Sequence, residues 1–199
     1  MLVLLFPAMV AGMAGAIWTG SLAGLRRMRI QWWPLGVGAL AIKALIQDPP
    51  INQQAWALVW GPPIWVACLV VILAMLVRNA LRPGHARIGW EIAALGTALN
   101  LLVVVANSGY MPQSASARMA VKGAMLPASA NVTQLHNVTQ MTPDSHLAWL
   151  GDNFAQPSWL PMANVVSVGD LTLSLGIALL AFLTIAQRPS HVGGTPADS

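Results

Sequence analysis

The sequence predicts an all-α membrane protein in which five transmembrane helices form a bundle, with one long outer loop of short helices. The first observation is composition, since 56% of the 199 residues are hydrophobic and only 8% are charged. A soluble domain carries roughly 25% charged residues. The second is that five apolar stretches follow one another along the chain. The third is that the arginines gather in alternate gaps between these stretches, which is the positive-inside pattern of a five-span protein.

The basic residues also predict the orientation. They follow the first, third and fifth apolar stretches: Arg26, Arg27, Arg29, Arg78, Arg82, Arg87 and Arg188. The gap after the second stretch has none, and the long gap at residues 107–160 has only Arg118 and Lys122. We therefore expect the N-terminus outside and the C-terminus in the cytoplasm. These side chains mark topology and contact lipid headgroups, so the lipid bilayer is the expected partner and nucleic acid is not.

The first span is predicted at residues 1–22. Positive charges follow it, whereas a secretory signal peptide has them in front, so we expect a retained helix. Small residues recur at every fourth position: Ala8, Gly12, Ala16, Gly20 and Gly24. Such a stripe lets another helix approach closely. Packing within the bundle is the favoured interpretation, and homodimerisation is the alternative.

The second span, residues 32–46, is short, because about 20 residues are normally needed to cross the hydrocarbon. A re-entrant segment is the alternative. Crossing is favoured because it keeps the arginines near Arg78 on the same side as those near Arg26. Lys43 then lies near the outer end, where a lysine side chain can reach water.

The third and fourth spans are predicted at residues 55–77 and 88–106. Glu91 lies one helical turn from Arg87, which predicts an ion pair. Asn100, near the middle of the fourth span, is expected to hydrogen-bond a neighbouring helix rather than a substrate.

The outer loop at residues 107–160 has few charges and an apolar set close to the last span: Trp149, Leu150, Phe154, Trp159 and Leu160. We expect short helices that lie on the outer mouth of the bundle, with the tryptophans at headgroup level.

The fifth span is predicted at residues 164–186, and Asp170 is the residue to explain. An aspartate at the centre of a span costs about 2.5–3.5 kcal/mol. If the helix starts near Asn164, Asp170 shares an inward face with Ser167 and Ser174, and Lys43 is its expected partner. Alternatively, Ser167 and Asp170 form a capping box at the helix start. The longer helix is favoured, because a start at Ser167 leaves few residues to cross.

No P-loop, dinucleotide fingerprint or hydrolase motif is present, so no catalytic activity and no cofactor are predicted. The outer loop does contain soft-metal ligand types: His136, His146, Met111, Met119, Met125 and Met141. Copper binding is a hypothesis only, because their spacing matches no ligand pattern.

Three segments resemble the corresponding motifs of a bacterial integral-membrane family known as domain of unknown function 5317. They are Asn107-Ser108-Gly109-Tyr110-Met111-Pro112, residues 147–157, and Val166-Ser167-Val168-Gly169-Asp170. The resemblance covers most of residues 1–187 and departs at Trp18-Thr19-Gly20-Ser21, where the family has a Gly-Gly pair. It implies a multi-pass protein of the bacterial cytoplasmic (inner) membrane, but no reaction, substrate or cofactor.

Residues 188–199 are expected to be a disordered cytoplasmic tail.

Two functions follow as hypotheses. The favoured one is a non-enzymatic accessory protein that binds another membrane protein, or itself. The alternative is a small oligomeric transporter or channel that uses Asp170. The candidate functional polar residues are Asp170, Ser167, Ser174, Lys43, Asn100 and Asn107. The candidate helix-packing residues are Gly12, Ala16, Gly20 and Gly24.

Overall fold

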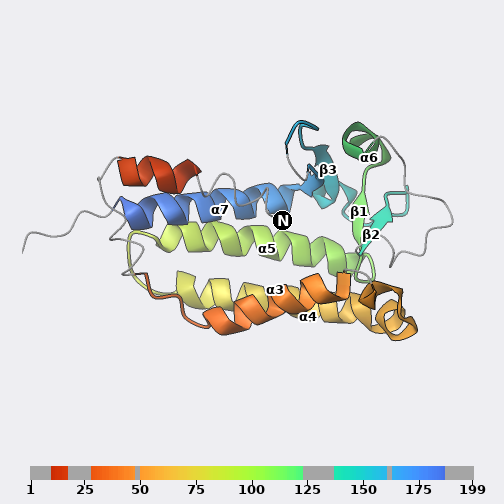
Figure 1. Cartoon of the computed structure of the whole chain (residues 1–199), viewed down its shortest axis with the longest axis horizontal. Coiled ribbons are helices and arrows are strands. Elements are labelled where there is room, and N and C mark those ends of the chain that lie inside the picture. Colours follow the sequence, from red (N-terminus) through yellow and green to blue (C-terminus); the bar gives the residue numbers. More distant parts are fainter. Residues whose placement is uncertain (1–9, 18–27, 48–49, 123–136, 161–162, 187–199) are drawn as a thin grey trace, which may run out of the picture.

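The computed structural model describes residues 10–17, 28–47, 50–122, 137–160 and 163–186. Four helices run lengthwise beside one another, and a small sheet lies at one end of them (Figure 1). They are α3 (Trp33–Gln47), α4 (Ala55–Ala80), α5 (Arg87–Ala106) and α7 (Val168–Ile185). Residues 10–17 are also helical and lie alongside α7.

Helix α5 forms the centre of the fold, because it packs against α4 on one side and α7 on the other. One buried cluster joins α4 and α5 to the sheet end: Leu69, Val103, Val104, Met111 and Leu150. A second cluster lies nearer the other end of these helices: Leu76, Ala93 and Ala94. The first cluster therefore packs the sheet end against α4 and α5, and the second packs the helices against one another.

Small residues line the contact between α5 and α7. A Cβ atom added to Gly176 would lie 2.7 Å from the Cα of Ala93, and one added to Gly89 would lie 2.8 Å from the Cα of Leu180. Gly96 and Gly169 are packed equally closely across the same contact. Close backbone approach of this kind is how van der Waals packing holds helices together in lipid. This contact was not predicted, and it is distinct from the small-residue stripe predicted on the first span.

The segment between α5 and α7 contains a four-stranded sheet that the sequence analysis did not predict. Its strands are β1 (Met111–Gln113), β2 (Val138–Gln140), β3 (Asp152–Ala155) and β4 (Val165–Ser167), in the order β2-β1-β3-β4. β1 is parallel to β2 and β3, whereas β3 and β4 are antiparallel. Strands of three or four residues are too short to give a period-two signal, so only pairing between distant segments reveals them.

Short helices are also present, as expected. They are α6 (Ala115–Lys122) and the 3-10 helix η3 (Ala148–Leu150) between α5 and α7, and the 3-10 helix η1 (Ile51–Gln53) before α4. The prediction of short helices at residues 107–160 is therefore correct for α6 and η3 and incomplete without the sheet.

Within the described residues, α4, α5 and α7 are long and apolar enough to cross a membrane. Helix α3 has the predicted position but only 15 residues, so a fourth crossing is not shown by length. Of the first predicted span, only residues 10–17 are described, and the predicted tail at residues 188–199 lies outside the described residues. Three candidate spans are thus found among the described residues, and the prediction of five transmembrane helices is not confirmed.

The fifth predicted span starts later than expected. Helix α7 begins at Val168 rather than at residue 164, because Val165–Ser167 pair with β3 as strand β4. The backbone of Val165–Ser167 is therefore paired with β3 in the sheet instead of forming the first turn of the helix.

Candidate functional site

Asp170 closes a capping box at the start of α7. Its backbone N–H donates to Ser167 Oγ at 2.9 Å, and the Ser167 N–H donates to Asp170 Oδ2 at 3.2 Å. The carboxylate therefore lies in the first helical turn, where it compensates free amides and the positive end of the helix dipole. The prediction of a longer helix with Asp170 inside it was wrong, and the capping alternative is the one observed.

Asn100 connects this cap to α5. Its Nδ2 donates to Asp170 Oδ1 at 2.8 Å, and Ser167 Oγ donates to Asn100 Oδ1 at 2.7 Å. Ser167 is completely buried and Asn100 is 7% exposed. A Cβ atom at Gly169 would lie 2.6 Å from Asn100 Cγ, so only glycine leaves room for this bridge. Asn100 thus bonds a neighbouring helix, as predicted.

Asp152 is a buried carboxylate near the partly buried Asp170, and it was not among the predicted site residues. It lies on β3 opposite Ser167 and is 6% exposed. Gln113 Nε2 donates to Asp152 Oδ2 at 3.2 Å, and Arg118 Nη1 donates to Gln113 Oε1 at 3.2 Å. Its only sequence signal is a position between the apolar residues Leu150 and Phe154.

The environment of Asp152 favours its neutral form. Burial is the main cause that raises the pKa of Asp152 to about 8, and the nearby charge of Asp170 acts in the same direction. The hydrogen bond from Gln113 and the positive charge of Lys43 act in the opposite direction. A carboxyl group of this kind can bind a proton near neutral pH.

Lys43 on α3 lies within electrostatic range of both carboxylates, Asp170 and Asp152. Its Nζ lies 3.9 Å from the centre of the Trp65 ring on α4, an attractive cation–π geometry. The structure therefore brings Lys43 into the neighbourhood of Asp170, while Asn100 makes the hydrogen bond to it.

The other two candidate polar residues are Asn107, at the end of α5, and Ser174, on α7. Asn107 Nδ2 donates to the carbonyls of Val103 and His146, both at 2.8 Å, and its Oδ1 accepts from the His146 N–H at 3.0 Å. It thereby ties the end of α5 to the segment before η3. Ser174 is buried on α7 with 5% exposure. The predicted ion pair between Arg87 and Glu91 is present, with Nε and Oε1 2.6 Å apart.

The predicted packing stripe of the first span contacts α7. A Cβ atom added to Gly12 would lie 3.4 Å from Ile185 Cδ1, and one added to Gly15 would lie 3.2 Å from the same side chain. Ala16 belongs to the same short helix, whereas Gly20 and Gly24 lie outside the described residues. The described part of this stripe therefore packs within the chain.

The copper hypothesis receives no support from the described part of the chain. Met111 is buried in the core beside Leu69, and His146 is at the surface. His136 and Met125 lie outside the described residues. Among the described residues, no group of three or more His, Cys, Asp or Glu side chains is placed to hold a metal ion.

An apolar groove runs between α3 and α4 and has a volume of about 330 Å³. Its lining residues are Pro34, Leu35, Gly38, Ala39, Ile42, Ile64, Ala67, Cys68 and Val71. No atom lies within 4 Å of the position that a Cβ at Gly38 would occupy, so the groove is open there. Because its lining is apolar apart from the thiol of Cys68, the groove suits an apolar ligand or helix.

Comparison with known proteins gives one finding on family membership. Neither the curated proteins nor the solved structures contain a match. A family model described as a family of unknown function, DUF5317, matches residues 27–182 and so covers the capping box, Asp152, Asp170 and the groove. The chain therefore belongs to the DUF5317 family.

Proposed function

We propose that this protein is a multi-pass membrane protein without catalytic activity, which binds another membrane component in the groove between α3 and α4. The observation that carries the proposal is the open apolar groove of about 330 Å³. Binding pockets usually begin at about this size, roughly 300 Å³.

The composition of the groove supports binding rather than chemistry. Three of the lining residues, Gly38, Ala39 and Ala67, are small and leave space in the groove. Small residues of this kind permit close approach of a chain or helix in lipid. The contact between α5 and α7 also contains small residues, but there the two helices already fill the space.

The test is to fill the groove without disturbing the fold. Gly38→Leu adds a side chain where no atom lies nearby. Val105→Leu is the matched control, because Val105 is exposed on α5, away from the groove. Wild type and both variants are purified in mild detergent, and bound components are identified by native mass spectrometry. The proposal expects a component that is present in wild type and Val105→Leu and depleted in Gly38→Leu.

Recovery of wild type as a lone monomer with no bound component would contradict the proposal. The same conclusion would follow if Gly38→Leu retained every component at the wild-type level.

We further propose that the chain crosses a bacterial inner membrane five times, with its N-terminus outside and its C-terminus inside. The apolar helices and the arginine pattern support this arrangement. Cys68 is the single cysteine, so Cys68→Ser gives a background without thiols. In that background, Asp144→Cys should react with an impermeant thiol reagent in spheroplasts, and His85→Cys only after lysis. Reaction of His85→Cys before lysis would overturn the orientation.

A second candidate function is a proton or ion route, and the pair of carboxylates favours it. Asp152 and Asp170 lie near Lys43 at the end of the bundle, and burial of Asp152 favours binding of a proton. Proteoliposomes with Asp170→Asn or Asp152→Asn test this route by proton and cation flux. If wild-type flux equals that of empty liposomes, or if neither variant changes it, this candidate is excluded.

A further inference from the structure

We propose that the groove binds one anionic phospholipid, with an acyl chain between α3 and α4 and the phosphate at Arg29 and Arg78. This inference rests on the proposed function, because it identifies the membrane component that occupies the groove.

A positive charge lies on α4 beyond the residues that line the groove. Ile64, Val71 and Arg78 are spaced seven residues apart on α4, which places them on the same face of the helix. Ile64 and Val71 line the groove, and Arg78 follows two turns beyond Val71. Met75, between them, packs against Gly36 of α3, so the two helices remain in contact near this end.

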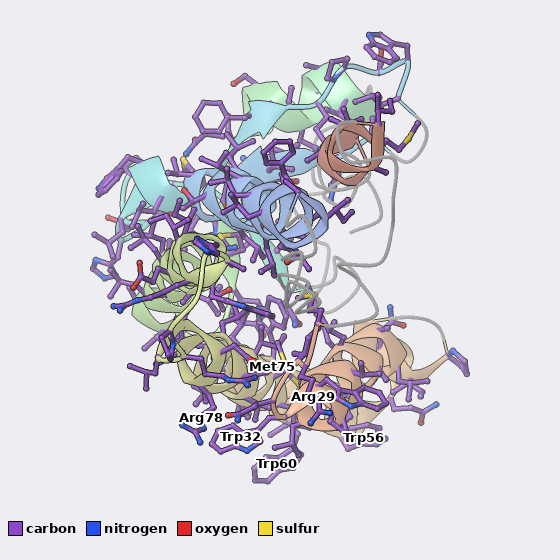
Figure 2. All side chains as sticks on the ribbon, turned by 90° about the vertical axis from the view of Figure 1, so that its left-hand side faces the viewer. Arg29, Trp32, Trp56, Trp60, Met75 and Arg78 are labelled. Atoms are coloured by element: carbon purple, nitrogen blue, oxygen red, sulfur yellow. The ribbon has the colours of Figure 1, made fainter. Side chains whose placement is uncertain are left out.

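The loop before α3 adds a second arginine at the same end. Asn79, which is 2% exposed, accepts a hydrogen bond from the Gln31 N–H and donates one to the Gln31 carbonyl, both at 2.9 Å. Arg82 Nη1 donates to the carbonyl of Arg29 at 2.9 Å. These bonds hold the loop against the end of α4. Figure 2, which views the helices end-on, shows Arg29, Trp32 and Arg78 on the α3–α4 side of the molecule, with Trp32 between the two arginines in this view.

Both arginines are available to a ligand. Arg29 and Arg78 are both exposed. The ion pair found among the described residues joins Arg87 to Glu91 and involves neither Arg29 nor Arg78. A guanidinium group offers several N–H donors that match the oxygens of a phosphate. Trp32 is 50% exposed beside them, as is typical of tryptophans at headgroup level.

The combination of features selects a phospholipid over the other occupants. A free phosphate would satisfy the arginines but leave the groove empty, and a partner helix would fill the groove without supplying an anionic group at the arginines. An anionic phospholipid supplies the acyl chain and the phosphate in one molecule. The cytoplasmic leaflet, where Arg29 and Arg78 lie in the proposed orientation, is also where anionic lipids attract basic residues.

The experiment measures lipid binding to the purified full-length protein by native mass spectrometry. Phosphatidylglycerol, phosphatidylcholine and inorganic phosphate are added in separate titrations. We expect wild type to prefer phosphatidylglycerol over phosphatidylcholine, and Arg78→Gln to lower its affinity for phosphatidylglycerol by about fivefold, as for the loss of one basic residue near a membrane surface. Arg29→Gln, in a loop, should have the same effect without a change inside a helix. Arg87→Gln is the control and should retain wild-type affinity.

Each result separates this inference from the proposed function. Equal binding of the two lipids, or wild-type affinity in both Arg78→Gln and Arg29→Gln, would overturn the anionic lipid but leave a groove that binds another component. Binding of inorganic phosphate that persists in Gly38→Leu, together with no lipid binding, would overturn it in favour of a free anion. If Gly38→Leu weakens no bound component, the proposed function fails as well.

Discussion

Replacing Asn100 by alanine should destabilise the protein by removing the bridge between α5 and α7. Asn100 donates to Asp170 at 2.8 Å and accepts from Ser167 at 2.7 Å. Hydrogen bonds between helices in a membrane average about 0.6 kcal/mol, and a buried polar group without a partner costs about 1–3 kcal/mol. We therefore expect a loss of about 1–3 kcal/mol in the free energy of unfolding.

Thermal unfolding in detergent measures this loss. In a chain of this size, each kcal/mol corresponds to about 2–4 °C in Tm. Thr97→Val is the matched control, because Thr97 is 2% exposed on the same helix and its hydroxyl bonds only the carbonyl of Ala93 in that helix. A double-mutant cycle with Ser167→Ala should show coupling, because the two side chains share a hydrogen bond. Equal Tm values for Asn100→Ala and Thr97→Val, with no coupling to Ser167→Ala, would refute the reasoning.

Two further predictions concern the buried carboxylate and the close helix contact. Burial raises the pKa of Asp152 from 3.8 to about 8, so the folded protein retains a proton that the unfolded chain loses, and Tm should fall as the pH rises from about 4 to about 8. Asp152→Asn should flatten this dependence, and an unchanged pH profile would contradict the assignment. Gly176→Val should lower the free energy of unfolding by about 1–3 kcal/mol or more, because its Cβ would lie 2.7 Å from the Cα of Ala93. Gly38→Ala is the control, because no atom lies within 4 Å of the added Cβ. Equal Tm values for the two variants would contradict the close contact at Gly176.

Local sequence signals predicted part of the candidate site. The spacing of Ser167 and Asp170 suggested the capping box as an alternative, and the position of Asn100 in an apolar helix suggested a bond to a neighbour. The capping box joins residues three positions apart, whereas the partner of Asn100 is 70 positions away and is identified only by the structure. Asp152 and Gln113 could not be predicted in the same way, since each is buried by segments far away in the sequence.

The sequence by itself determined the class of the protein and most of its helices. Composition and apolar length are local properties, and they predicted α4 and α5 to within a few residues, as well as the ion pair of Arg87 with Glu91. The tertiary structure decided where α7 begins, because strand β4 can exist only beside β3.

The tertiary structure also decided which small residues make the helix contact and where the groove lies. Gly12 and Gly96 both occur in small-residue patterns, but only the packing of α5 against α7 shows that Gly96 lies at the closest approach. The groove depends on how far α3 and α4 separate, which no pattern within either helix contains. Contacts between distant segments are set by how whole surfaces fit together, so they become visible only in three dimensions.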